Sequence, residues 1–81
     1  MENKVAVISI IVENTESVDA LNTLLHDYRD YVIGRMGLPY RKRNINIISL
    51  ALDAPQETIT ALSEKMGTLS GVSVKTAVSA E

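Results

Sequence analysis

The stretch Val5–Val12, with the sequence VAVISIIV, does most to define the fold. Its unbroken apolar and mostly β-branched composition is typical of a short strand that is buried on both faces. A second stretch of this kind, Ile45–Leu52 with the sequence INIISLAL, follows later in the chain. We therefore expect these two segments to be the central strands of one sheet.

An amphipathic helix is predicted over about 16–29. The side-chain oxygen of Asn14 or Thr15 can cap its first turn, because it accepts from backbone amides that have no partner in the helix. Apolar residues then recur at helical spacing, with polar residues between them. These apolar residues are Val18, Leu21, Leu24, Leu25 and Tyr28.

A second helix is predicted directly after the second apolar strand. Asp53 is the expected N-cap, Pro55 suits the first turn, and Gln56 can close a capping box. Gly67 is the residue expected to end this helix. The apolar stripe consists of Ile59, Leu62 and Met66.

The remaining segments complete a β-α-β-β-α-β order. We expect a weaker strand at 31–36, a hairpin loop at 37–44 and a last strand at 72–78. This order predicts an α+β, ferredoxin-like βαββαβ sandwich, in which two helices cover one face of a four-stranded antiparallel sheet. The whole chain, 1–81, is expected to form a single domain.

Composition limits the possible functions. The chain has 81 residues, a net charge of −2, no cysteine and one histidine, His26. We therefore expect no metal centre and no cofactor, since zinc and nickel sites are built from several thiolate or imidazole ligands. The acidic balance and the absence of aromatic residues from the central strands argue against nucleic-acid binding. No apolar run reaches the ~20 residues that span a bilayer, so we expect a cytoplasmic protein without a membrane partner.

The second face of the sheet is predicted to be an oligomer interface. Two helices can cover one face only, and alternation along the central strands leaves apolar residues on the other. Contiguous apolar surface of this kind usually marks an interaction site. We expect a homodimer or tetramer, the alternative being cover by loops or the C-terminal tail. The expected interface residues are Val5, Val7, Ile11, Ile45 and Ile47.

No catalytic group is predicted. The neighbouring carboxylates Glu13 and Glu16, and likewise Asp27 and Asp30, have no histidine or serine arranged with them for proton transfer. We interpret them as solvated surface charges. His26 is interpreted as a helix-surface residue.

One segment concentrates positive charge. Four of the eight basic residues lie between positions 35 and 43. Arginine can bind a carboxylate or phosphate through two hydrogen bonds, and backbone beside glycine can approach an anion closely. The segment is therefore predicted to bind an anionic ligand or an acidic partner, unless it is a solvated hairpin tip that protects the sheet edge. The candidate residues are Arg35, Gly37, Tyr40, Arg41 and Arg43, with Lys42 beside them.

The segments VAVISIIVEN, YVIGRMGLPYR, INIISLALDAP and GVSVKTAVS together resemble the iron-only hydrogenase system regulator family, a group of short bacterial ACT-like proteins. The most specific part is Ile33–Arg41. The resemblance implies an ACT-like fold similar to the C-terminal domain of the nickel-responsive repressor, which is a tetramer. That repressor binds nickel through several histidines and a cysteine and reaches DNA through an N-terminal ribbon-helix-helix arm. This sequence lacks those ligands and begins in its first strand, so we expect neither nickel sensing nor direct DNA binding.

The expected function is therefore that of a non-enzymatic, oligomeric regulatory module that binds a small-molecule effector or a partner protein. Two alternatives remain at this level. One is a small enzyme that acts on an anionic substrate through the Arg35–Arg43 segment. The other is a structural scaffold for hydrogenase maturation.

Overall fold

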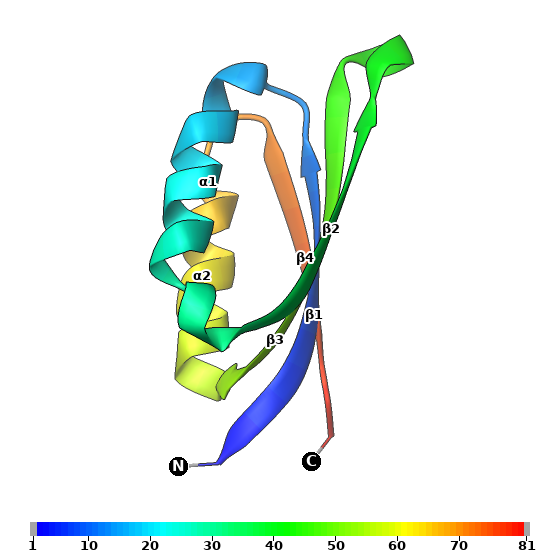
Figure 1. Ribbon diagram of the computed structural model, residues 1–81. Coiled ribbons are helices and arrows are strands. Elements are labelled where there is room, and N and C mark those ends of the chain that lie inside the picture. Colours follow the sequence, from blue (N-terminus) through cyan, green and yellow to red (C-terminus); the bar gives the residue numbers. More distant parts are fainter. Residues whose placement is uncertain (1, 81) are drawn as a thin grey trace.

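A computed structural model describes residues 2–80 of the chain. Three short 3-10 turns, at Thr15–Ser17, Arg29–Tyr31 and Arg41–Arg43, connect some of the main elements. The strands and helices follow the predicted order (Figure 1). They are β1 (Asn3–Val12), α1 (Val18–Asp27), β2 (Val32–Tyr40), β3 (Ile45–Pro55), α2 (Gln56–Gly67) and β4 (Val72–Val78).

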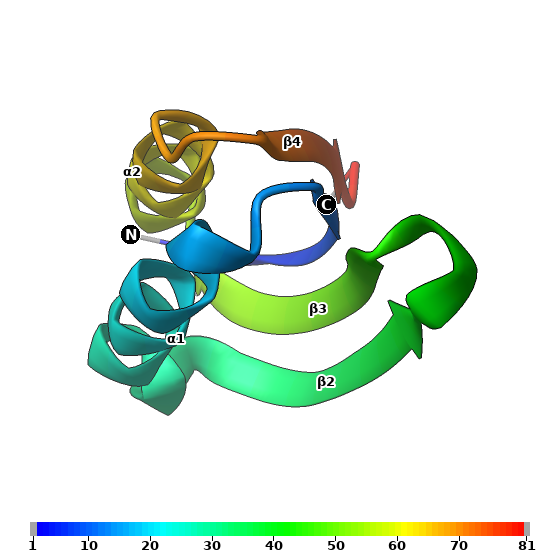
Figure 2. The same ribbon diagram turned by 90° about the horizontal axis from the view of Figure 1, so that it is seen from above.

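The strands form one antiparallel sheet in the order β2-β3-β1-β4. The two most apolar strands are central, as predicted. Both helices lie on the same face of the sheet, with α1 on the β2 side and α2 on the β4 side (Figure 2). The α+β, ferredoxin-like βαββαβ arrangement is therefore confirmed.

The core lies between the helices and the inward face of the sheet. Ile8, Ile10 and Leu50 from the central strands are fully buried against Leu21 of α1 and Leu62 of α2. Burying each such side chain stabilises the fold by about 1.5–3 kcal/mol. The predicted division of the central strands into two faces is confirmed, because the residues that alternate with the predicted interface residues are buried: Ala6, Ile8, Ile10 and Val12 of β1, and Ile48, Leu50 and Leu52 of β3.

Several predicted boundaries are wrong. The first helix covers Val18–Asp27 and is shorter than the predicted range 16–29, because one 3-10 turn precedes it and another follows it. Asp53 is not the N-cap of α2. It lies within β3, which continues to Pro55, and it pairs with Val5 of β1. The side chain of Gln56 donates to Thr60 instead of closing a capping box.

The second helix ends at Gly67 as predicted, but Gly67 is not a left-handed residue beyond the cap. It is the last residue of α2, and the cap is Thr68, whose φ of −81° is helical. The cap is instead held by the Thr68 hydroxyl, which donates to the carbonyl of Lys65 at 2.7 Å.

The β2–β3 hairpin is longer than predicted. β2 includes Pro39, which an edge strand tolerates because the missing N–H can face outward. The turn is confined to Arg41–Asn44, where Asn44 takes the left-handed conformation with φ 55°. The hairpin tip consequently projects beyond the helices (Figure 1).

Neither helix within residues 2–80 has the length and apolar character that crossing a membrane requires.

Candidate ligand-binding groove and interaction face

A β-bulge determines the direction of Arg35. Val32 pairs with Leu52, whose side chain faces the helices. Three residues later Arg35 pairs with Leu50, which faces the same way. Strict alternation from Val32 would have turned Arg35 to the opposite face. The register shift between Val32 and Gly34 adds one residue and aims the arginine toward α1.

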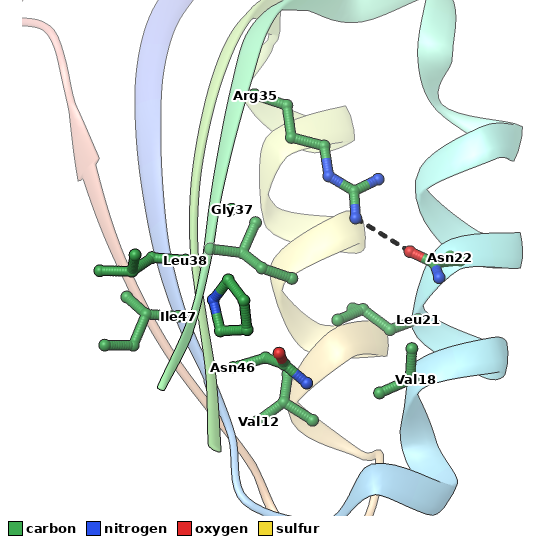
Figure 3. A pocket seen from close by; sticks show the side chains of 11 residues that line it. Val12, Val18, Leu21, Asn22, Arg35, Gly37, Leu38, Asn46 and Ile47 are labelled. Carbon is green, nitrogen blue, oxygen red and sulfur yellow. Dashed lines mark hydrogen bonds between the residues drawn. The ribbon is translucent and has the colours of Figure 1, made fainter. Parts of the chain in front are cut away.

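The side chain of Arg35 bridges β2 and α1. Its Nη2 donates to Oδ1 of Asn22 at 2.9 Å (Figure 3). Within residues 2–80 this is the one hydrogen bond of the guanidinium, and it has no ion pair there. Since a guanidinium carries five N–H donors, most of them are free to meet a ligand.

Two neighbouring cavities share the Arg35–Asn22 pair as part of their walls. The first has a volume of about 270 Å³ and is mainly apolar, with Val12, Val18 and Leu21 pointing into it (Figure 3). The second, of about 410 Å³, lies toward the C-terminal end of α1. We call the second one the arginine cavity. Its remaining lining residues are Leu25, His26, Arg29, Val32 and Leu50.

The arginine cavity is electropositive. Arg29 lines it beside Arg35, and its Nη1 donates to the backbone carbonyl of His26 at 2.9 Å. None of the lining residues is acidic. Within residues 2–80 no three His, Cys, Asp or Glu side chains gather as a metal site would require. The geometry therefore favours an anion held by hydrogen bonds.

The structure separates the residues of the predicted basic segment. Gly37 lies with Arg35 in the groove, where it lines the apolar cavity. Tyr40 and Arg41 line a distinct hollow of about 60 Å³ at the hairpin tip. Arg43 is exposed in the turn itself. The single predicted cluster is thus two sites.

Sequence reasoning missed the contribution of α1 to the groove. Asn22 and His26 of α1, and Arg29 of the turn that follows it, are spaced four and three residues apart, which places polar groups along one side of a helical segment. This spacing is the signal that the sequence offers for the groove. It does not identify a site by itself, because the fold has to place Arg35 of β2 beside the same side of the helix.

The outward face of the sheet is apolar, as predicted. Val5, Val7 and Ile11 of β1 and Ile47 of β3 are exposed, while Ile45 is half-buried. The extension of β2 adds three large residues that the sequence analysis placed at the end of a strand or in a loop. They are Met36, 68% exposed, Leu38, 60% exposed, and Tyr40, 42% exposed.

Comparison with known proteins identifies the family of the chain. The sequence profile of the TM1266-like family, whose description is "Iron-only hydrogenase system regulator, putative", matches residues 4–76. The chain belongs to this family. The structure of uncharacterized protein TM1266 from Thermotoga maritima is similar throughout, with a TM-score of 0.91 and 37% identity over 95% of this chain and 98% of that one. The resemblance to the iron-only hydrogenase system regulator family, predicted from the sequence, is thereby confirmed.

A formyltetrahydrofolate deformylase from Pseudomonas putida KT2440 shares the fold. The TM-score is 0.64 at 14% identity, over 90% of the TM1266-like chain and 28% of the deformylase. At this identity the likeness concerns the fold alone. A search of curated proteins found no match.

Proposed function

We propose that this TM1266-like chain is a non-enzymatic regulatory protein of the iron-only hydrogenase system that acts in the cytoplasm. In this proposal it works as a homo-oligomer and responds to a ligand bound between α1 and β2. The observation that carries the proposal is the guanidinium of Arg35, held at 2.9 Å from Asn22 across a groove with open cavities on both sides.

The groove supports a ligand-responsive role because it lies between two elements, β2 and α1, that one side-chain hydrogen bond connects. Arg35 belongs to an edge strand and Asn22 to a helix, and one hydrogen bond connects the two side chains. A ligand that binds Arg35 competes with or reinforces that bond. Such a ligand changes the relative energy of two arrangements, which is the requirement for regulation by binding.

The outward sheet face supports self-association. The outward-facing positions of the four strands carry one acidic residue, Asp53, and one basic residue, Lys75, beside a broad apolar area. A surface with few and balanced charges suits a second copy of itself better than a strongly charged partner. Soluble monomers seldom expose contiguous apolar patches of this extent.

Two observations favour regulation over catalysis or direct DNA contact. The imidazole of His26 has no hydrogen-bond partner within residues 2–80, so it is not arranged beside a hydroxyl as a general base would be. The net charge of −2 lacks the basic excess that binding to phosphate backbones uses. An effect on transcription would then pass through a bound effector or a partner protein.

The test combines a cellular and a biochemical measurement. Deleting the gene in its own organism should change the transcript or activity level of the iron-only hydrogenase. Native mass spectrometry of the protein purified from that organism should show an oligomer with a bound small molecule, which Arg35→Ala loses. Unchanged hydrogenase levels in the deletion strain would overturn the proposed function.

A further inference from the structure

The arginine cavity brings cations together from two separate elements. Arg35 enters from β2, and Arg29 enters from the turn that follows α1. Each guanidinium makes one hydrogen bond within residues 2–80, Arg35 to Asn22 and Arg29 to the carbonyl of His26. Both arginines are exposed, and several of their N–H groups remain unpaired. Two cations with no lining acid create a local excess of positive charge.

The floor of the same cavity is apolar. Leu25 and Leu50 are buried, and Val32 is half-buried at its margin. A volume of about 410 Å³ falls within the roughly 300–1,000 Å³ that is common for small-molecule sites. An apolar floor under a cationic rim matches a ligand that has one anionic group and one apolar part.

We infer that the arginine cavity binds a small organic acid, with its carboxylate on Arg29 and Arg35 and its apolar body over Val32 and Leu25, above the fully buried Leu50. The inference rests on the proposed ligand-responsive function and names the chemical class of its ligand. The planar N–H pair of a guanidinium matches the two oxygens of a carboxylate. Phosphate sites commonly add backbone amides of glycine-rich loops, whereas this cavity has no lining glycine.

The surrounding polar groups fit this assignment. Asn22 accepts from Arg35 through Oδ1, so its amide nitrogen stays available as a further donor. His26 lines the cavity as well and can donate to a carboxylate through a ring N–H. The ligand would therefore meet side-chain donors of Asn22 and His26 in addition to those of the two arginines.

Binding can be measured by titrating the isotope-labelled protein with isovalerate and following its backbone amide resonances. The probe should shift the resonances of Asn22, His26, Val32 and Arg35. The neutral isostere isovaleramide and inorganic phosphate are matched probes, the first without the charge and the second without the apolar body. Both should bind more weakly than isovalerate. Equal binding of phosphate or isovaleramide, or no shift with isovalerate, would overturn the inference.

Variants assign the interaction to the two arginines. Arg35→Ala and Arg29→Ala should each weaken isovalerate binding by about tenfold or more, since a hydrogen bond to a charged group is worth about 1.5–3 kcal/mol. Arg35→Lys keeps the charge but loses the fork, and should fall between. Arg41→Ala, which removes the same charge at the hairpin tip, should leave binding unchanged. Thermal melting should show that the variants remain folded, and a large loss of stability in Arg35→Ala with binding intact would contradict the inference.

The outcomes separate this inference from the proposed function. If organic acids fail to bind while deletion still alters hydrogenase levels, the ligand class is wrong and the regulatory role stands. If isovalerate binds as expected while deletion has no effect, the site exists but the regulatory role is wrong.

Discussion

At the residue scale, one side-chain hydrogen bond within residues 2–80 links α2 to the C-cap of α1, Tyr28. Lys65 of α2 donates from Nζ to the hydroxyl of Tyr28 at 3.0 Å. This hydrogen bond, with the electrostatic effect of the same ring, raises the pKa of Lys65 above its usual value of 10.5. The charged form of Lys65 is thus favoured in the folded chain relative to the unfolded one.

Tyr28→Phe should remove that effect and lower the melting temperature slightly at neutral pH. Because the folded-state pKa is raised, the contribution is complete below 10.5 and is lost as pH rises through the higher folded value. The difference between Tyr28→Phe and the unaltered protein should therefore close at strongly alkaline pH. Tyr31→Phe, which removes a neighbouring phenol, is the control, since no hydrogen bond involves the Tyr31 hydroxyl within residues 2–80. A difference that persists unchanged at alkaline pH would contradict this account.

His26 is the residue on which any metal site would have to depend. We predict that the protein retains no nickel or zinc after dialysis against a mild chelator, because tight sites combine several imidazole or thiolate ligands. Metal analysis of the dialysed protein checks this. Stoichiometric metal that disappears in His26→Ala would point instead to a site shared between copies.

At the element scale, the junction between β1 and α1 is tied to the turn before β4. The amide of Glu13 donates to the carbonyl of Gly71 at 2.7 Å, and the Ser17 hydroxyl donates to the carbonyl of Ser70 at 2.6 Å. Gly71 has φ 71°, and a Cβ there would lie 2.6 Å from Cβ of Asn14. The junction therefore requires glycine for both its conformation and its close approach.

Gly71→Ala should destabilise the fold by at least about 1–3 kcal/mol, the cost of a strained left-handed residue, with the close contact added. Gly67→Ala is the matched control, because a Cβ at Gly67 meets nothing within 4 Å. Alanine there should be neutral or stabilising by up to about 1 kcal/mol, since it favours helix. Urea unfolding of both variants gives the comparison. Equal free energies of unfolding for Gly71→Ala and Gly67→Ala would show that the junction accommodates a Cβ at position 71, and would contradict this account.

At the scale of the whole molecule, the question is whether the outward sheet face is covered in solution. Met36 is 68% exposed in the single chain, so a charge there has no reason to unfold it. Met36→Asp should nevertheless dissociate the proposed oligomer. Ile47→Asp should dissociate it and also lower its stability, because an unpaired charge buried in an interface costs several kcal/mol. Light scattering at micromolar concentration measures the dissociation, and thermal melting measures the loss of stability.

Thr23→Asp is the control for these variants, because Thr23 is exposed on α1, away from the sheet face. It should leave the oligomer intact. An unaltered protein that is monomeric at micromolar concentration would refute the interface.

The sequence by itself determined the fold of this TM1266-like protein and the two faces of its central strands. The reason is that the apolar composition of Val5–Val12 and Ile45–Leu52 marks both as central strands, and residues that alternate along a strand must point to opposite faces. The charge content and the lack of cysteine likewise follow from composition. These features are local, so no knowledge of distant partners is needed to read them.

Only the tertiary structure decided how the site is assembled. The bulge after Val32 reverses the direction of Arg35, and a bulge depends on pairing with β3 rather than on local composition. The extent of β2 also depends on that pairing, which keeps Pro39 in the strand and brings Met36 and Leu38 onto the outward face. The arginine cavity exists because the fold packs α1 beside β2, so that Arg29 and Arg35, which are not neighbours in the helix or the strand, line one cavity.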